Sequence, residues 1–347
     1  MTSTVGYDIK SAKDISTYGP NWCAGCGDFV ILASDKNVTA KLITEHGWRS
    51  EDFENIGGIG CSAKEVEWLV EKYQGLNRGT YGFHTLHGRD PAVAVGALLA
   101  NPNLHVTVFG GDGDLGAIGL AEFMHTVRKN YNLTIIFFDN QVYGLTKGQA
   151  SPTAHKGLVT GSTPEGVKDK PIPPALYAMM AGATYVARAF SQKRKELEEI
   201  LLGAMLHRGC SMIQVITPCV TYQREEGGKI RGTGIYKWWE EHFTPIQKVW
   251  DEAKGMVQSP EETAEYDVSN LLHAVAVELK AGEEQRWPLG LLYKKEGEPT
   301  GEENLDLVKV EKRKGGKESV MVHAPVHADI SVAQNLPYYR KLIAGLR

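Results

Sequence analysis

The sequence predicts an α/β protein with a mostly parallel sheet covered by helices on both faces, plus a C-terminal extension. Three observations support this: short apolar runs rich in β-branched residues, helical spacing between those runs, and a change of composition after about residue 220. The runs are apolar throughout instead of alternating with polar residues. That pattern is typical of parallel strands buried on both faces.

The clearest unit of this kind lies between residues 103 and 140. Residues 105–109 form an apolar run that ends in two glycines and predict a strand, and residues 115–129 carry apolar side chains at helical spacing. Residues 133–138 predict the next strand. A crossover helix between two buried strands indicates a parallel βαβ unit.

The same patterns place further elements on either side of this unit. Helical spacing predicts helices over 29–46, 91–99 and 191–206, and apolar runs predict strands over 53–56, 183–187 and 211–216. Residues 227–234 are rich in glycine and predict a loop. Strands that alternate with helices up to about residue 220 favour one continuous parallel sheet.

The C-terminal part has a different texture, and we expect a division into 1–250 and 251–347. The first segment would hold the chemistry, and the second would pack on it or on a partner. Within the second, residues 312–317 predict a charged turn and residues 338–346 a short helix in a tail that starts near residue 324.

Composition and charge restrict the class of protein. The 347 residues carry a formal net charge of −4, so no basic surface for nucleic acid is expected. Residues 91–111 lack formal charge, but two prolines and two asparagines interrupt them, which argues against a membrane span. The N-terminal residues are polar, so we expect no secretory signal and a cytoplasmic protein.

A glycine loop follows the strand at 105–109. Gly111-Asp112-Gly113-Asp114-Leu115-Gly116 matches the G-x-G-x-x-G pattern of dinucleotide-binding proteins, and Asp139 ends the next strand, where such proteins hold a ribose. The carboxylate of Asp112 argues against this, because it would repel a pyrophosphate placed directly on the loop. An NAD-binding protein remains an alternative.

A divalent cation between protein and diphosphate explains the acidic residue better. Mg²⁺ favours one or two protein oxygens together with phosphate oxygens. Asp112 would supply one oxygen, the side chain of Asn140 a second and the carbonyl of Val142 a third. The carboxyl ends of neighbouring parallel strands would bring these groups together. The alternative is that Asp112 only caps the helix that follows.

The cysteines allow several interpretations. Cys23 and Cys26 form a C-x-x-C pair, whereas Cys61 and Cys219 stand singly in turns that contain glycine or proline. A thioredoxin-like pair should follow a strand, and a structural zinc site favours compact pairs. Four thiolates in turns with free backbone N–H groups suit a cubane iron–sulfur cluster. Cys210 begins an apolar run and is expected to be a small buried hydrophobe.

Taken together, these motifs resemble one family, the β subunits of 2-oxoacid:ferredoxin oxidoreductases. The resemblance covers roughly residues 15–225 and rests on WCAGCG, GIGCS followed by Lys64, HGRD, GDGD with the later Asn140, and TPC. Gln141 stands where many family members carry a second Asn. The length and the loop after Cys219 look most like the 2-oxoglutarate type.

The resemblance implies a thiamine diphosphate-binding fold with Mg²⁺ and one [4Fe–4S] cluster. Cys23, Cys26, Cys61 and Cys219 would hold the cluster, and the segment Ile59-Gly60-Cys61-Ser62 would touch both cluster and coenzyme. The backbone of Gly113 and Asp114 would face the diphosphate, and Gly144 and Leu145 would line the coenzyme.

It also implies the reaction and the partners. The enzyme would convert a 2-oxo acid and coenzyme A to acyl-CoA and CO₂, or run in reverse, passing single electrons through the cluster to ferredoxin. The glutamate that activates thiamine would come from an α subunit, so this chain alone would be inactive. We expect two α and two β subunits, and no nucleic acid or membrane partner.

Cationic and polar side chains near these motifs are candidates for the substrate site. They are Lys64, His84, His87 and Arg89. We hypothesise that Lys64 binds a substrate carboxylate, although Lys64 also suits a solvated helix and each histidine could be a structural residue. The alternative substrate is pyruvate or a broad range of 2-oxo acids. More distant alternatives are a zinc-stabilised or NAD-binding protein and an electron-transfer module without thiamine.

Overall fold

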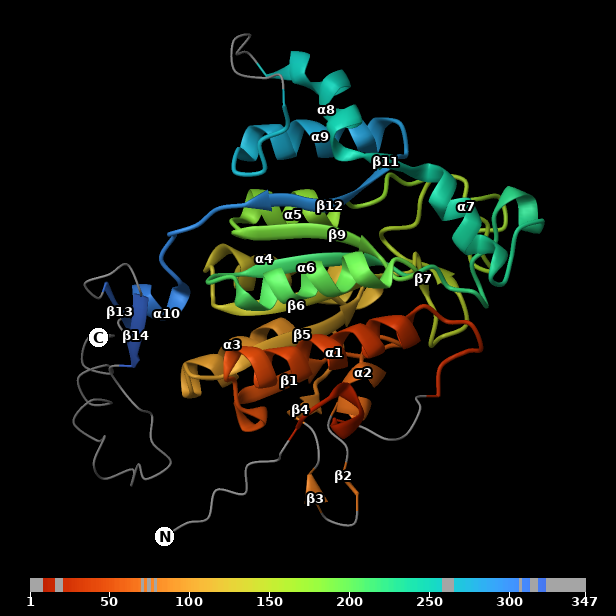
Figure 1. Ribbon diagram of the computed structural model, residues 1–347. Coiled ribbons are helices and arrows are strands. Elements are labelled where there is room, and N and C mark those ends of the chain that lie inside the picture. Colours follow the sequence, from red (N-terminus) through yellow and green to blue (C-terminus); the bar gives the residue numbers. More distant parts are fainter. Residues whose placement is uncertain are drawn as a thin grey trace, which may run out of the picture.

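A computed structural model describes residues 9–15, 21–69, 72–73, 76–77, 80–257, 265–305, 308–312 and 318–322 (Figure 1). Its centre is an eight-stranded sheet of order β11-β12-β9-β10-β6-β5-β1-β4. The strands are β1 (Phe53–Gly57), β4 (Tyr81–His84), β5 (His105–Gly111), β6 (Leu133–Asp139), β9 (Tyr185–Phe190), β10 (Ser211–Ile216), β11 (Phe243–Pro245) and β12 (Trp287–Lys294).

The sheet is parallel apart from one pairing. β4, β1, β5, β6, β10 and β9 run in the same direction, and β12 pairs antiparallel with β9. β12 belongs to the C-terminal segment, so this segment contributes a strand to the main sheet. The division at residue 250 stays a prediction.

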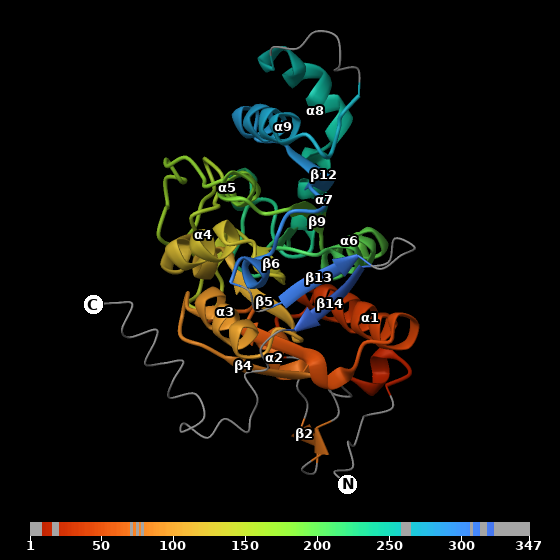
Figure 2. The same cartoon turned by 90° about the vertical axis from the view of Figure 1, so that its left-hand side faces the viewer.

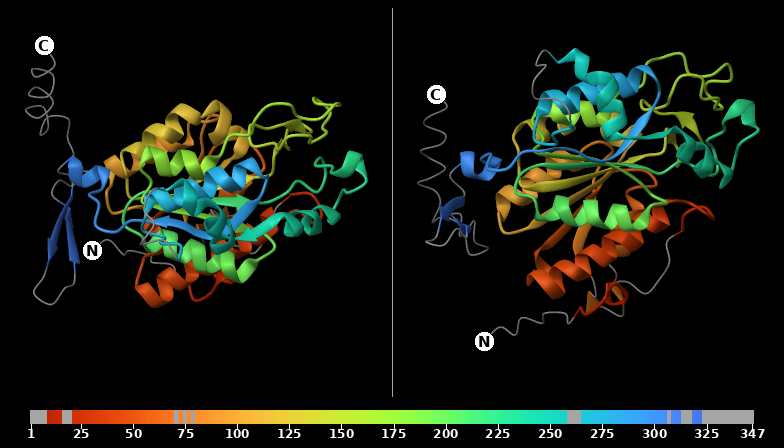
Figure 3. Two further views of the ribbon diagram at one scale, coloured as in Figure 1. Left: turned by 90° about the horizontal axis from the view of Figure 1, so that it is seen from above. Right: turned by 45° about the horizontal axis from the view of Figure 1, so that its top comes forward.

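Helices cover both faces of the sheet (Figures 2 and 3). One face packs against α1 (Asp28–His46) and α6 (Arg194–Leu206), and the other packs against α3 (Asp90–Ala100), α4 (Leu120–Arg128) and α5 (Pro174–Ala181). Alternate residues of β6 reach opposite layers, because successive side chains of a strand point to opposite faces. Ile136 and Phe138 join the first layer, and Ile135 and Phe137 join the second. The predicted α/β architecture is confirmed.

The remaining helices and strands are short or lie at the margins. They are α2 (Lys64–Leu69), α7 (Gly234–His242), α8 (Ile246–Ala253), α9 (Leu271–Glu283), α10 (Gly301–Asn304), β2 (Lys72–Tyr73), β3 (Leu76–Asn77), β7 (Val142–Tyr143), β8 (Gln149–Ala150), β13 (Val308–Lys312) and β14 (Glu318–Val322). α8 and α9 pack on each other through Val249, Trp250 and Val277. None of the helices in the described part of the chain combines the length and apolar character that a membrane span needs.

Two predicted helices have different boundaries. The helix expected over 115–129 is interrupted, because Asp114–Ile118 forms a wider π-type turn in which Gly119 N bonds to Asp114 O at 2.7 Å. Gly119 also lies against Gly88, so the interruption brings the HGRD segment to the glycine loop. The helix expected from 191 begins at Arg194, because β9 continues to Phe190 and Ser191 N still bonds to Ile216 O.

Some predictions fall on segments that the structure does not describe. Residues 313–317 of the charged turn and the tail from 324, with the expected helix over 338–346, lie outside the described residues. The strands on either side of the turn, β13 and β14, pair antiparallel. The loop expected over 227–234 overlaps a short 3₁₀ turn at Glu226–Gly228, and its last residue, Gly234, begins α7.

Candidate active site

A cavity of about 90 Å³ lies at the carboxyl ends of β1, β5 and β6. This is the edge at which parallel α/β sheets gather functional groups. Four segments line it: the loop after β1, His87, the glycine loop after β5, and the turn after β6. The lining residues are Ile59, Gly60, Cys61, Ser62, His87, Gly111, Asp112, Gly113, Asp114, Asn140, Val142, Tyr143, Gly144, Leu145 and Thr146.

The structure therefore brings together groups that are up to 87 positions apart, between residues 59 and 146. All eight predicted coenzyme-binding residues line this one cavity, as do Asp112, Asn140 and Val142. Their roles in binding remain predictions, whereas their meeting at one place is a structural finding.

Asp112 is buried and bound on several sides. Its Oδ2 accepts hydrogen bonds from Gln141 N at 2.6 Å and Ser151 Oγ at 2.7 Å and lies 2.8 Å from Thr153 Oγ1, and its Oδ1 accepts one from Gly113 N. Burial, and then the nearby charge of Asp139, raises the pKa of Asp112 to about 7. A divalent cation would offset both effects, because its charge favours the carboxylate.

The turn after β6 is attached to Asp112 through the amide of Gln141. Gln141 has φ of +63°, a left-handed conformation that turns the chain sharply. Val142 N then donates to Asn140 Oδ1 at 3.0 Å. The turn thus places Asn140 and Val142 in the cavity lining beside Asp112, as a shared Mg²⁺ site requires.

Asp139 does not have the position that an NAD-binding protein needs. It is buried, Gln214 Nε2 donates to its Oδ2 at 2.6 Å, and Thr153 Oγ1 lies 2.7 Å from its Oδ1. Asp139 also lies outside the lining of the cavity. Both oxygens are therefore engaged within the protein, and the ribose-binding role does not fit.

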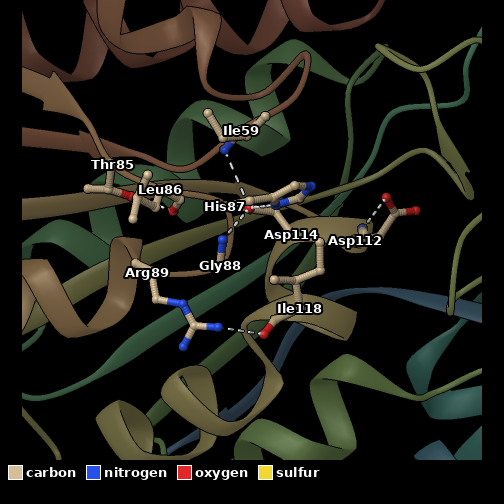
Figure 4. Close-up of polar contacts among 10 residues, drawn as sticks. Ile59, Thr85, Leu86, His87, Gly88, Arg89, Asp112, Asp114 and Ile118 are labelled. Carbon is tan, nitrogen blue, oxygen red and sulfur yellow. Dashed lines mark hydrogen bonds and ion pairs between the residues drawn. The ribbon is translucent and has the colours of Figure 1, made fainter.

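Asp114 joins two of the sequence motifs to the glycine loop (Figure 4). Its Oδ1 accepts a hydrogen bond from Gly88 N at 2.7 Å and a longer one from Ile59 N at 3.4 Å, and it contacts Nδ1 of His87. A Cβ at Gly58 would lie 1.8 Å from Asp114 Oδ2, so only glycine fits there. Asp114 therefore holds the loop after β1 and the HGRD segment against the cavity.

Two buried polar atoms of the lining residues have no hydrogen-bond partner among the described residues. They are Ser62 Oγ and Asp114 Oδ2. Buried polar atoms are nearly always paired in folded proteins. The hydroxyl of Ser62 can donate to a phosphate oxygen, so this part of the lining fits a bound diphosphate coenzyme. The carboxylate of Asp114 can only accept, and it interacts with the neighbouring buried carboxyl of Asp90.

The four predicted cluster cysteines form one group. Cys26 N bonds to Cys23 O at 3.0 Å, which closes the C-x-x-C turn, and the carbonyl of Cys61 accepts a bond from Trp22 Nε1 at 2.9 Å. Burial raises the pKa of Cys26, Cys61 and Cys219, and that of Cys61 reaches about 12. The charges of Asp28 and of other cysteines in the group add to this effect.

The metal group that these cysteines would hold stays a prediction. Within the described ranges, no three His, Cys, Asp or Glu side chains are placed to hold one metal ion, so the zinc alternative gains no support. A cubane provides four separate iron sites for four thiolates. A cationic cluster would also offset the burial that disfavours the thiolates. Cys210 is fully buried away from this group, which confirms its expected place in the core.

The four predicted catalytic residues have different positions. His87 lines the cavity. Lys64 lies outside the lining at the start of α2 and is half-buried. Its charge partly offsets the rise that burial causes in the pKa of Cys61 and Asp28. His84 ends β4 with its Nε2 3.5 Å from Glu67 Oε1, and Arg89 pairs with Glu122 and donates to Ile118 O. Their roles remain predictions.

Several site residues escaped the sequence analysis. Ser151 and Thr153 hold Asp112, and Tyr143 and Thr146 line the cavity. Hydroxyl groups in a loop have no periodic spacing that would reveal them. The only signal was indirect: a buried aspartate between glycines needs donors from somewhere else in the chain.

Comparisons with known proteins agree with this geometry. Residues 58–215 match the family described as thiamine pyrophosphate enzyme, C-terminal TPP binding domain. The chain is 36% identical over 290 residues to the β subunit of 2-oxoacid:ferredoxin oxidoreductase 2 of Aeropyrum pernix, covering 83% of this chain and 84% of that protein.

A second relative is 2-oxoglutarate oxidoreductase subunit KorB of Mycobacterium tuberculosis, 41% identical over 233 residues. That alignment covers 65% of this chain and 58% of the relative's own length. Among solved structures, 2-oxoglutarate:ferredoxin oxidoreductase from Magnetococcus marinus is 35% identical, with a TM-score of 0.69 and coverage of 86% of this chain and 90% of that one.

The relatives match most of the chain in sequence, and the solved structure matches its fold, so they confirm the family inferred from the sequence. The chain belongs to the β subunits of 2-oxoacid:ferredoxin oxidoreductases, a family of thiamine diphosphate-binding oxidoreductases.

Proposed function

We propose that this chain is the catalytic β subunit of an enzyme that converts a 2-oxo acid and coenzyme A to acyl-CoA and CO₂ and passes the electrons to ferredoxin. One observation carries the proposal: the coenzyme cavity and the cysteine group share Cys61. A Cβ on Gly144, in the turn after β6, would lie 3.3 Å from Cys61 Sγ. Electron transfer from coenzyme to cluster needs this proximity.

The residues of the cavity divide the binding of the coenzyme between them. Asp112, Asn140 and the carbonyl of Val142 would hold Mg²⁺, and the backbone of Gly113 and Asp114 would meet the diphosphate. Ser62 Oγ is an unpartnered buried atom that could donate a hydrogen bond to a phosphate oxygen. Cys23, Cys26, Cys61 and Cys219 would hold the cluster.

Thiamine diphosphate supplies an electron sink for the carbanion that forms when CO₂ leaves. The protein supplies position and environment. His87 lies in the lining with its Nδ1 on Asp114, which leaves Nε2 as the atom that can exchange a proton with a bound group. Trp22 Nε1 holds the carbonyl of Cys61 and so fixes the backbone between cavity and cysteines.

The need for a partner subunit is inferred from a group that the cavity lining does not provide. Among the described residues that line the cavity there is no glutamate, whereas activation of thiamine needs a carboxyl at its aminopyrimidine ring. We infer that an α subunit supplies this group and that two α and two β chains form the enzyme. Thiolate ligands need a reducing compartment, which supports the cytoplasm as its location.

We propose 2-oxoglutarate as the substrate and succinyl-CoA as the product. The names of the Mycobacterium tuberculosis and Magnetococcus marinus proteins specify 2-oxoglutarate, and Lys64 offers a cation near Cys61 for a second carboxylate. Relatives named only for 2-oxo acids make pyruvate or a broad range the second candidate.

The test is co-expression with the gene for the α subunit under anaerobic conditions. The purified complex should be brown, contain iron, sulfide and releasable thiamine diphosphate, and reduce a viologen when given coenzyme A and 2-oxoglutarate. Faster reduction with pyruvate would assign the second substrate. A pale complex that ignores added thiamine diphosphate would overturn the proposal.

A further inference from the structure

A second cavity lies on the far side of Asp139 and is larger than the coenzyme cavity. Its volume is about 370 Å³, within the range of small-molecule sites in proteins. The loop from Thr153 to Pro173, α5, α9 and the start of β12 form its walls. It shares no lining residue with the coenzyme cavity.

The floor of this cavity is a fixed network of buried polar side chains. Arg188 Nη1 and Nη2 donate to the two carboxylate oxygens of Glu278 at 2.8 Å and 2.6 Å, and Arg188 Nε donates to Gln214 Oε1 at 2.9 Å. Gln214 Nε2 in turn donates to Asp139 Oδ2 at 2.6 Å. Arg188 is 4% exposed and Glu278 5%, so the charges of this pair compensate each other inside the protein.

The sides of the cavity are mainly apolar. Pro171, Ile172, Leu176, Leu279 and Trp287 line it. Leu279 of α9 is 42% exposed, whereas Val277 of the same helix is fully buried. Apolar walls above a satisfied polar floor favour a ligand with an aromatic or aliphatic body.

Cationic side chains also line the cavity. Lys156 and Lys170 line it, both are exposed, and neither forms an ion pair with any described residue. Arg286 also lines the cavity, and its buried Nε has no hydrogen-bond partner in the described part of the chain, although Glu252 and Glu284 pair with its other end. Apart from Asp139 and Glu278 of the floor, the acidic lining residue is the exposed Glu283.

We propose that this cavity is a second binding site, for an organic anion with an aromatic or aliphatic body and one carboxylate, phosphate or sulfonate group. The body would lie between Ile172, Leu279 and Trp287. The anionic group would meet Lys156, Lys170 and the free N–H of Arg286, because charge-assisted hydrogen bonds to an anion are stronger than neutral ones.

The floor connects this site to the coenzyme cavity. Thr153 lines the second cavity, and its Oγ1 lies 2.7 Å from Asp139 Oδ1 and 2.8 Å from Asp112 Oδ2. An occupant that shifts Thr153 or Asp139 changes the hydrogen bonds of Asp112, so the two sites are coupled. This part of the inference rests on the proposed role of Asp112 in holding Mg²⁺ and thiamine diphosphate.

The binding test uses anilinonaphthalene sulfonate, an aromatic sulfonate whose fluorescence rises in an apolar site, with the intact heteromeric enzyme free of thiamine diphosphate. The double variant K156Q/K170Q should bind the probe about tenfold more weakly, because two charge-assisted contacts are lost. L279W should remove binding by filling the cavity. K168Q is the matched control, since Lys168 pairs with Glu165 and lies outside the lining. It should bind as the wild type does.

Three results would overturn the proposal. The first is that the heteromer does not bind the probe, and the second is that K156Q/K170Q and L279W bind it as the wild type does. The third is that coenzyme A or 2-oxoglutarate displaces the probe, because this would show that the cavity binds a substrate of the main reaction. Coupling is measured separately: saturating probe should change the affinity for thiamine diphosphate and Mg²⁺ by about threefold or more.

If the affinity for thiamine diphosphate is unchanged when the probe is bound, the two sites are not coupled. The measurements of probe binding and of coenzyme binding test the second site and the proposed function separately. A heteromer that binds the probe as expected but never binds thiamine diphosphate would contradict the proposed function and leave the second site intact.

Discussion

Gly144 lies directly against Cys61: a Cβ at Gly144 would approach Cys61 Sγ to 3.3 Å. Both residues line the coenzyme cavity, and Cys61 is also one of the four grouped cysteines. The turn after β6 and the loop after β1 therefore meet where coenzyme and cluster would be neighbours. The absence of a side chain at Gly144 lets this thiol reach the boundary between the two sites.

Replacing Gly144 by valine tests this contact. The added methyl groups would press on Cys61, and overpacking of this kind typically costs 1–3 kcal/mol, which corresponds to about 5- to 150-fold in an equilibrium constant. We expect G144V to weaken thiamine diphosphate about tenfold and to lower the iron content of the heteromer. Titration of the coenzyme and iron analysis measure the two effects. G161V is the control, because a Cβ at Gly161 would meet nothing within 4 Å.

The proposed cluster ligands include Cys219 but not Cys210, which lies nine positions earlier in the chain. C219S should lose the brown colour and the broad visible absorbance, because a serine hydroxyl is a poor substitute for a thiolate ligand. C210S should keep both, since Cys210 is buried in the core without a part in the cysteine group. Loss of the cluster in C210S, or its retention in C219S, would contradict the ligand set.

Asp112 provides the test of the metal site. D112N keeps the shape of the side chain but removes its charge, so thiamine diphosphate at fixed Mg²⁺ should bind about 100-fold more weakly, and chelation of Mg²⁺ should have the same effect on the wild type.

Thr153 tests the support of Asp112. T153V removes the hydroxyl 2.8 Å from Asp112 Oδ2 and should weaken binding about tenfold, whereas T153S should restore it. Isothermal titration of the coenzyme measures all three variants. Equal affinity of T153V and T153S would show that the hydroxyl does not support Asp112.

Lys64 tests the choice of substrate. If its ammonium binds the second carboxylate of 2-oxoglutarate, K64A should raise KM for 2-oxoglutarate about tenfold or more and leave KM for pyruvate within about twofold. Steady-state viologen reduction with both acids gives the comparison. An equal change with both acids would show instead that Lys64 acts on the cysteine group, whose Cys61 it already influences.

His207 makes stability depend on pH. Its side chain is buried, and burial lowers its pKa from 6.5 to about 4, while the unfolded chain titrates near 6.5. Between pH 6.5 and 4 the unfolded state binds a proton that the folded state does not, so the free energy of unfolding falls as the pH drops through this window and is fully retained above it.

At pH 5 the loss from His207 should be about 1–2 kcal/mol. H207Q keeps a hydrogen-bonding group near Thr184 Oγ1, which lies 2.8 Å from Nε2 of His207, and removes the titration. The difference in melting temperature between pH 7 and pH 5 should therefore be smaller in H207Q than in the wild type. An identical difference would show that His207 is already protonated in the folded protein.

Patterns among neighbouring residues were sufficient to predict part of the fold and part of the site. Apolar runs and helical spacing located the strands around the glycine loop, because burial on both faces of a sheet demands continuous apolar residues. The C-x-x-C pair and the single cysteines in turns identified the thiols, and the acidic glycine loop identified Asp112. Each of these signals lies within a few neighbouring residues.

Other features depend on contacts that no local pattern contains. The antiparallel insertion of β12 beside β9 follows from packing of a segment about 100 residues later in the chain, as does the bond of Arg188 to Glu278 across 90 positions. Ser151 and Thr153 carry no spacing signal, so only the fold shows that their hydroxyl groups hold Asp112.

The sequence alone thus predicts the βαβ core, the thiols and the acidic loop. The reason is that hydrophobic periodicity and ligand residue types can be recognised within short segments of the chain. Folding alone decides that these stretches meet at one cavity, that Lys64, His84 and Arg89 stand outside its lining, and that a second cavity opens behind Asp139. The physical reason is that side-chain burial and hydrogen-bond satisfaction are settled between segments far apart in the chain.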